Sequence, residues 1–151
     1  ADGPKLIEYN VRFGDPECEA IMPRLKGDVA ALLRAVADND LAQATVTLSA
    51  EASMTVIYAA NGYPGAPDKG GAITGLATAE AQEGVTIFHA GTTEDADGQI
   101  RANGGRVLAV TALGSDLPSA RQRAYQAMET INFPTGFYRR DIGWRELERL
   151  A

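Results

Sequence analysis

The chain has 151 residues, which is enough for one domain or for one domain and part of another. Its 14 basic and 20 acidic residues are interspersed and give a net charge of −6, so no surface for a nucleic acid is predicted. With 45% hydrophobic residues and no apolar run near the roughly 20 residues that cross a bilayer, we expect a globular protein without a membrane partner.

The cysteine and histidine content limits the disulfides, metal sites and catalytic arrangements that the chain can form. Cys18 is the single cysteine and His89 the single histidine. One cysteine cannot form an internal disulfide, so we expect a reducing cytoplasm. A zinc site and a Ser-His-Asp or Cys-His catalytic arrangement are excluded on the same count.

The first residues predict a chain that continues upstream. They lack an initiating Met and the basic start and apolar core of a secretory signal. Asp2-Gly3 is a hairpin-turn dipeptide with no strand before it in this sequence. A loose terminus over Ala1–Pro4 is the alternative.

Lys5–Phe13 is predicted to form a half-buried strand, because its side chains alternate in character. One face is apolar and consists of Ile7, Tyr9, Val11 and Phe13. The other face carries Leu6, Glu8, Asn10 and Arg12.

The second face of this strand carries groups that can bind a metal ion and an anion. The carboxylate of Glu8 and the amide of Asn10 supply hard oxygen ligands, which suit Mg²⁺ bound together with substrate phosphates. The guanidinium of Arg12 can hold a phosphate or a carboxylate. On spacing alone, a merely polar outer face is the favoured interpretation.

Helical signals follow this strand. Gly14 ends it, Asp15 is predicted as an N-cap, and Pro16–Met22 as a short helix. A second helix is predicted from Asp28, its N-cap, to Ala37, and a short strand over Thr45–Leu48.

The middle of the chain is richer in strands and turns. A central strand, a glycine-rich loop, a brief strand, a short helix and a further strand are predicted over Ser53–Ala60, Gly62–Gly71, Ala72–Leu76, Ala77–Gln82 and Val85–His89. Ala90–Gly98 is predicted as a polar loop.

The last third begins with a predicted hairpin. Gln99–Asn103 and Arg106–Ala112 flank a Gly104-Gly105 turn. The longest helix is expected over Leu117–Ile131, after Asp116. An extended segment over Phe137–Asp141 and a short helix from Trp144 end the chain.

Several sequence motifs carry a resemblance. The run R-F-G-D-P-E-C-E follows E-Y-N in the first 19 residues. Four further motifs follow in order: G-Y-P-G at 62–65, F-H-A-G-T at 88–92, N-G-G-R-V-L at 103–108 and Y-R-R-D-I-G at 138–143. Together they resemble the C-terminal portion of glycinamide ribonucleotide synthetases (phosphoribosylamine–glycine ligases), which are ATP-grasp enzymes of purine synthesis.

The resemblance implies an α+β fold in two parts. Residues 1–44 would be the C-terminal segment of an ATP-grasp domain, with the metal-ligand strand and the helices after it. Residues 45–151 would form a small, mainly antiparallel β domain with one long helix. The family's front, with its glycine-rich lid and ATP-binding lysines, would lie upstream and would be the missing partner of this chain.

The implied activity belongs to the intact enzyme. Such a ligase joins glycine to 5-phosphoribosylamine with ATP, through a glycyl phosphate, and this chain alone is expected to be inactive. Another ATP-grasp carboxylate–amine ligase and a non-catalytic binding or assembly module are the alternatives.

The resemblance also assigns roles on the Lys5–Phe13 strand. Glu8 and Asn10 would be ligands of Mg²⁺ or Mn²⁺, and Leu6 would border the adenine of ATP or serve packing. Arg12 would bind substrate and stabilise negative charge as a catalytic residue. An ion pair of Arg12 with Asp15 or Glu17 is its structural alternative.

Substrate contacts are implied for the turn after the strand. Gly14, Asp15 and Glu17 would bind substrate, with the two carboxylates orienting an amine. The alternative for Asp15 is a plain helix cap. Arg106, beside the predicted glycine turn, could face the active-site cleft.

Overall fold

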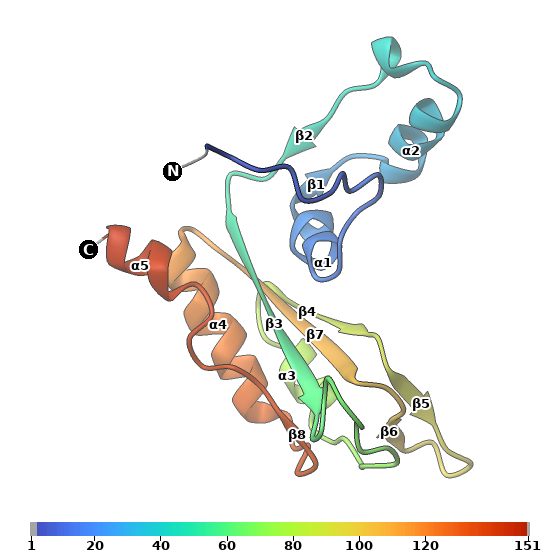
Figure 1. Ribbon diagram of the computed structural model, residues 1–151, viewed down its shortest axis with the longest axis vertical. Helices are drawn as coiled ribbons and strands as arrows, with labels where there is room; N and C mark the ends of the chain where they lie inside the picture. Colours follow the sequence, from blue (N-terminus) through green and yellow to red (C-terminus); the bar gives the residue numbers. More distant parts are fainter. Residues whose placement is uncertain (1–2, 151) are drawn as a thin grey trace.

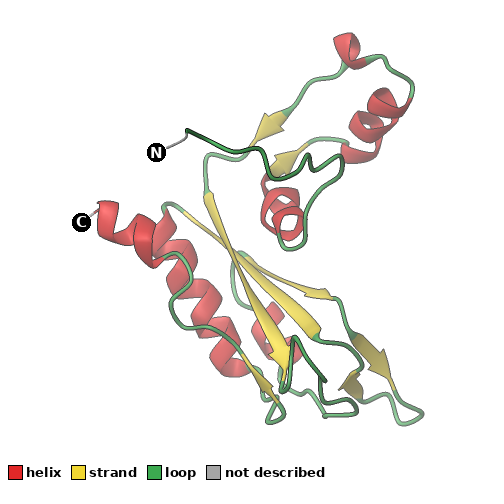
Figure 2. Cartoon of the chain, viewed as in Figure 1, coloured by secondary structure: helices red, strands yellow, loops and turns green. Residues whose placement is uncertain are grey.

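The computed structural model describes residues 3–150 and has two parts (Figure 1). Residues 52–150 build an antiparallel sheet with helices packed against it, and residues 3–48 form a smaller part beside this sheet (Figure 2). The predicted α+β class is confirmed. Asp2 of the predicted Asp2-Gly3 turn lies outside the described residues.

Four antiparallel strands form the main sheet in the order β4-β7-β3-β8. The strands span Val85–His89 (β4), Arg106–Gly114 (β7), Ala52–Ala60 (β3) and Gly136–Phe137 (β8). In the register of the central pair, Val56 lies opposite Val110 and Thr55 opposite Thr111. The predicted strands over Ser53–Ala60 and Val85–His89 are therefore confirmed.

The core lies between one face of this sheet and helix α4 (Leu117–Thr130). Alternate residues of β3 point into it, because successive side chains of a strand face opposite sides. These residues are Met54, Val56, Tyr58 and Ala60. They meet the buried stripe of α4, which consists of Ala120, Ala124, Ala127 and Met128. Small residues on this stripe let the helix lie close to the sheet.

The predicted starts of the two C-terminal helices are confirmed. Asp116 caps α4 by accepting a hydrogen bond from the Ser119 N–H at 2.8 Å. Helix α5 spans Trp144–Leu150. The short predicted helix over Ala77–Gln82 is found as α3, Leu76–Glu80.

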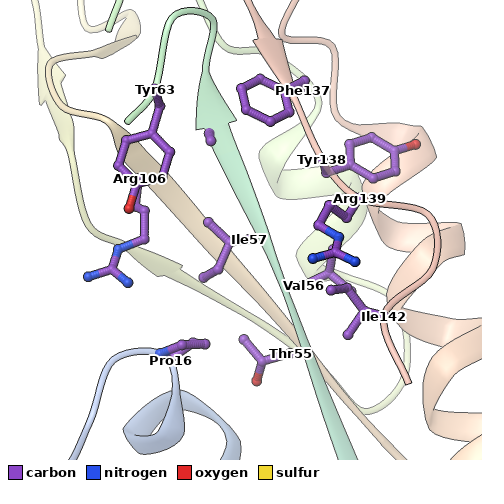
Figure 3. A pocket seen from close by; sticks show the side chains of 11 residues that line it. Pro16, Thr55, Val56, Ile57, Tyr63, Arg106, Phe137, Tyr138, Arg139 and Ile142 are labelled. Atoms are coloured by element: carbon purple, nitrogen blue, oxygen red, sulfur yellow. The ribbon is translucent and has the colours of Figure 1, made fainter. Parts of the chain in front are cut away.

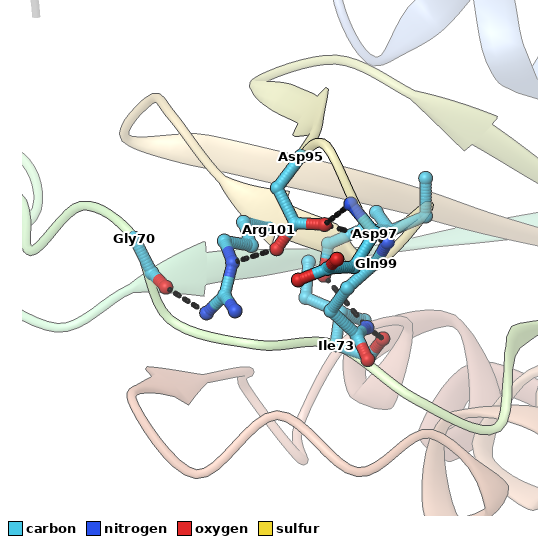
Figure 4. Close-up of polar contacts among 7 residues, drawn as sticks. Gly70, Ile73, Asp95, Asp97, Gln99 and Arg101 are labelled. Carbon is cyan, nitrogen blue, oxygen red and sulfur yellow. Dashed lines mark hydrogen bonds and ion pairs between the residues drawn. The ribbon is translucent and has the colours of Figure 1, made fainter.

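The predicted hairpin around Gly104-Gly105 is wrong. Strand β6 (Ile100–Ala102) pairs with β5 (Thr92–Glu94) and not with β7, so the region predicted as a polar loop contains a strand. The hairpin turn is at Asp95–Gly98 instead. There the Asp95 carboxylate accepts hydrogen bonds from the backbone N–H groups of Asp97 and Gln99, at 3.0 and 2.9 Å (Figure 4).

The glycines at 91 and 104 mark a bend rather than a turn. The backbone of Gly91 approaches that of Gly104 so closely that a Cβ on Gly91 would lie 2.8 Å from the Gly104 Cα. The segments β4-β5 and β6-β7 pass this point side by side, held by hydrogen bonds from the Asn103 N–H to the Gly91 carbonyl and from the Gly91 N–H to the Arg106 carbonyl. Both segments bend together because neither has a side chain there.

The smaller part contains short elements only. Its helices are α1 (Glu17–Ile21), η1 (Met22–Arg24), α2 (Val29–Ala37) and η2 (Leu41–Gln43). Strand β1 (Leu25–Lys26) pairs with β2 (Thr47–Leu48). Asp28 caps α2 as predicted, and the predicted helix over 16–22 and strand over 45–48 are confirmed in shorter form.

Two predicted strands are wrong. Lys5–Phe13 forms no strand, and Ile7 and Val11 are more than nine-tenths exposed, because no strand of the described residues lies beside it to accept its backbone hydrogen bonds. Ala72–Leu76 makes only isolated bridges, from Ala72 to Arg101 and from Thr74 to Asn132. Within residues 3–150, no helix has the length and apolar character needed to cross a membrane.

Candidate functional site

The face of the sheet away from α4 carries the polar side chains that hold α1. Ser53 and Thr55 of β3 and Thr111 of β7 belong to this face, opposite in parity to the core residues. The Ser53 hydroxyl donates to the Ala20 carbonyl at 2.7 Å, and the Thr111 hydroxyl donates to the Glu19 carbonyl at 3.1 Å. The sheet therefore docks α1 through hydroxyl groups rather than through a hydrophobic contact alone.

A cleft of about 370 Å³ opens beside this docking surface. Its floor is the remainder of the same sheet face, and aromatic side chains stand on two sides of it (Figure 3). The lining residues are Pro16, Thr55, Val56, Ile57, Ala59, Tyr63, Arg106, Phe137, Tyr138, Arg139 and Ile142. Pro16 belongs to the R-F-G-D-P-E run, so the cleft adjoins the signature motif.

Tyr63 is placed in the cleft by a glycine. A Cβ on Gly105 would lie 2.3 Å from Cδ2 of the Tyr63 ring, so the ring lies directly against the Gly105 backbone. The same loop contacts Arg101 further on, at Gly70, which does not line the cleft. There the Arg101 guanidinium donates to the Gly70 carbonyl at 3.1 Å and pairs with Asp95 at 2.5 Å (Figure 4).

Arg106 joins the cleft to the signature motif. Its Nη2 lies 3.2 Å from Oδ2 of Asp15, and its Nη1 donates to the Asp15 carbonyl oxygen at 3.2 Å. Both side chains are partly exposed, at 40% and 46%. Asp15 therefore does not cap α1 as predicted: the N-cap is Pro16, and no side chain caps the helix.

Arg139 lies at the other side of the cleft and is also paired. Its Nε and Nη2 donate to the two carboxylate oxygens of Asp141 at 2.9 and 2.7 Å. The hydrogen bond from Arg139 lowers the pKa of Asp141 and raises that of Arg139, so both groups are charged at neutral pH. The segment is fixed from α4, where the Tyr125 hydroxyl donates to the Arg139 carbonyl at 2.7 Å.

The cleft suits binding rather than proton transfer. None of its lining residues carries a carboxylate, an imidazole or a thiol. Each of its two guanidinium groups already faces an aspartate, so the charge along the rim is nearly balanced. An apolar floor with Tyr63 and Phe137 at its sides can accept a planar or apolar group.

The residues predicted to bind metal and nucleotide lie outside this cleft. Leu6, Glu8 and Asn10 are exposed on the irregular segment before α1. Glu8 makes no hydrogen bond or ion pair within the described part of the chain. Arg12 Nη1 donates to the Asn10 side-chain oxygen at 3.3 Å and to the Phe13 carbonyl at 3.1 Å.

The turn residues predicted to bind substrate lie close together. A Cβ on Gly14 would be 3.0 Å from Oε2 of Glu17 and 3.7 Å from Nη1 of Arg12, so both side chains lie near the Gly14 backbone. Between residues 3 and 150, Arg12 forms no ion pair with Asp15 or Glu17, the structural alternative considered for it. The Asp15 carboxylate pairs with Arg106 instead.

Sequence reasoning did not single out the aromatic residues of the cleft. Tyr63 belongs to a turn motif, G-Y-P-G, which predicts a loop but indicates no function. Phe137 belongs to an extended segment without periodicity. The alternation along β3 was a usable signal, because its core-facing residues imply that Thr55 and Ile57 face the other side.

Comparison with known proteins identifies the family. The family described as phosphoribosylglycinamide synthetase, C domain, matches residues 53–145, and the chain belongs to this family. A phosphoribosylamine–glycine ligase from Mesorhizobium japonicum is 54% identical over 147 residues, which cover 97% of this chain and 34% of that protein. A chloroplastic phosphoribosylamine–glycine ligase from Arabidopsis thaliana is 52% identical, over 97% of this chain and 28% of that protein.

A solved structure agrees in fold. The crystal structure of phosphoribosylamine–glycine ligase from Thermotoga maritima matches with a TM-score of 0.72 and 37% identity, covering 91% of this chain and 33% of that one. The recognised resemblance to this family is thus confirmed. The chain spans about a third of the length of these three relatives.

Proposed function

We propose that this chain is the C-terminal part of a phosphoribosylamine–glycine ligase, which joins glycine to 5-phosphoribosylamine with ATP in the cytoplasm. The observation that carries the proposal is the 54% identity to the Mesorhizobium ligase across 97% of the chain. The products would be glycinamide ribonucleotide, ADP and phosphate. The reaction would proceed through glycyl phosphate, which the amine of phosphoribosylamine attacks.

In this proposal the irregular segment before α1 serves the nucleotide. Leu6 borders the adenine, while Glu8 and Asn10 hold Mg²⁺ or Mn²⁺. Their carboxylate and amide oxygens are hard donors, and both side chains are exposed, so they fit such an ion together with ATP phosphates. When bound, the ion neutralises phosphate charge during phosphoryl transfer.

The turn after this segment would serve the substrates. Arg12 stabilises the negative charge of the acyl phosphate as it forms. Gly14, Asp15 and Glu17 bind substrate, and the carboxylates orient an amine. The clustering of Arg12 and Glu17 around the Gly14 backbone supports one shared subsite. Its contribution to the rate would come from position and charge.

We also propose the division of the chain into an ATP-grasp segment over 1–44 and a C-terminal domain over 45–151. Support comes from apolar side chains that residues 3–44 leave in water. Of the 14 large exposed hydrophobic residues in the described part, eight lie between Leu6 and Leu41. A surface of this kind needs a partner, and the preceding two thirds of a ligase would cover it.

The activity of a fusion protein tests this function. The chain alone and the chain fused to the N-terminal two thirds of the Mesorhizobium relative are assayed for ADP release with glycine and phosphoribosylamine. We expect turnover from the fusion only, lost with EDTA and restored by Mg²⁺ or Mn²⁺. Turnover by the isolated chain, or a fusion that folds and stays inactive, would contradict the proposal.

The same fusion distinguishes the alternatives. Another carboxylate–amine ligase would release ADP with a different acid or amine in a substrate panel, and not with glycine and phosphoribosylamine. A non-catalytic module would give no Mg²⁺-dependent protection of the fusion by ATP in limited proteolysis.

A further inference from the structure

Arg106 makes two contacts with a single residue that lies 91 positions away in the sequence. One contact joins its Nη2 to the Asp15 carboxylate, and the other joins its Nη1 to the Asp15 carbonyl, each at 3.2 Å. Because a guanidinium is planar and rigid, two such contacts fix the direction of the backbone at Asp15 as well as its side chain.

The position of Asp15 depends on such outside contacts. Helix α1 has five residues, too few to be stable by itself, and no side chain caps it. Thr111 and Ser53 hold the carbonyls of Glu19 and Ala20, in the later part of this helix. Arg106 holds the chain where it enters the helix, next to Gly14 and within the signature run.

We propose that Arg106 is a positioning residue for the ligase reaction. This proposal rests on the function proposed above. Arg106 fixes the Gly14–Glu17 turn against the C-terminal sheet, so that the turn presents its substrate-binding groups in one geometry. Arg106 does not bind an anion itself, because its charge is already balanced by Asp15. The sheet thus aligns a site to which it contributes no reacting group.

The chain offers a matched control in Arg101. Arg101 also lies on a strand, pairs with one aspartate and donates to one backbone carbonyl, that of Gly70. The side-chain exposure of the two arginines is nearly equal, at 39% for Arg101 and 40% for Arg106. Arg101 holds the β5-β6 hairpin and does not touch the signature run (Figure 4).

The reactivity of Cys18 gives the first test, on the chain as it is. Cys18 is the single cysteine, lies on α1 and is partly buried. We expect Arg106→Gln to speed its labelling by an aromatic disulfide reagent roughly three- to tenfold, because the helix loses one of its anchors. Arg101→Gln should leave the rate within about twofold.

Equal rates in the two variants would overturn the proposal. If Arg106→Gln does not fold, Arg106→Lys decides, because an ammonium keeps the charge but cannot reproduce the forked contact. It should label faster than the wild type, and an unchanged rate would again overturn the proposal.

The ligase fusion gives the second test. Arg106→Gln should lower kcat/KM for glycine and phosphoribosylamine about tenfold, whereas Arg101→Gln should change it less than about twofold. In an Asp15→Asn background, Arg106→Gln should cause a smaller loss than in the wild type, because its contact with the Asp15 carboxylate is already gone and only the contact with the Asp15 carbonyl remains to be lost.

Full additivity in this double variant would mean that Arg106 acts independently of Asp15, and the proposal would be wrong. If the wild-type fusion itself is inactive, the proposed function fails, and Cys18 labelling alone decides whether Arg106 positions the turn.

Discussion

At the scale of single residues, Thr111 connects the two parts of the protein. Its side chain is 1% exposed, and its hydroxyl has one proton, which goes to the Glu19 carbonyl at 3.1 Å. The hydroxyl of Thr55, 2.7 Å away, must therefore be the donor in the contact between the two threonines. The sheet satisfies its buried hydroxyl groups by using the backbone of α1.

We predict that Thr111→Val destabilises the chain by about 1–2 kcal/mol, because the new side chain has the same shape but leaves the partly buried Thr55 hydroxyl and Glu19 carbonyl unpaired. Chemical denaturation measures the change. Thr86 is the control: it lies directly across from Thr111 on β4 and makes no side-chain hydrogen bond among residues 3–150. Thr86→Val should cost less than about 0.5 kcal/mol, and equal losses would contradict the assignment.

At the scale of elements, α4 is the helix that covers the apolar face of the main sheet. It supplies four fully buried side chains, and its start is fixed by the Asp116 cap. Hydrogen bonds from the side chain and backbone of Ser119 lower the pKa of Asp116. Since the folded pKa lies below the unfolded value of about 3.9, this stabilisation is complete above that pH and is lost as the pH falls through the folded pKa.

We predict that Asp116→Ala lowers the melting temperature at pH 7 by a few degrees. The difference from the wild type should shrink below about pH 4, where the wild-type carboxylate becomes protonated. Asp116→Asn is the matched control, because it keeps a capping oxygen that does not titrate. Its advantage over Asp116→Ala should persist at low pH, and a difference between wild type and Asp116→Ala that does not depend on pH would refute the contribution of the ionised carboxylate to the cap.

At the scale of the whole molecule, the two parts differ in how much they bury. The core consists of residues from Met54 to Phe133, and none of the residues 3–42 and 44–48 is buried. The parts meet through α1, whose neighbours on the sheet are β3 and β7 (Figure 1). The larger part has its own core and should fold by itself.

We predict that a fragment of residues 50–151 unfolds cooperatively, with a melting temperature within about 5 °C of that of the whole chain. Residues 1–48 alone should show no cooperative transition, because they lack a core. Circular dichroism on the two fragments measures this. A disordered 50–151 fragment would mean that α1 contributes much more to stability than its contacts indicate.

The sequence by itself determined the features that depend on near neighbours. Asp28 and Asp116 cap their helices through backbone N–H groups three residues further along the chain. The extent of α4 follows from its own residues in the same way. The parity of β3 follows from its own alternation. The family followed from the motifs at 12–19 and beyond.

Only the tertiary structure decided where distant groups meet. Asp15 has the signature of a helix cap, yet Arg106, 91 positions away, takes its carboxylate. Lys5–Phe13 has the alternation of a strand, but backbone hydrogen bonds need a neighbouring strand, and the described residues supply none. Gly104-Gly105 has the composition of a turn, but the approach of Gly91 makes it a bend. In each case the local sequence is compatible with two conformations, and the presence or absence of a partner distant in the sequence determines which one forms.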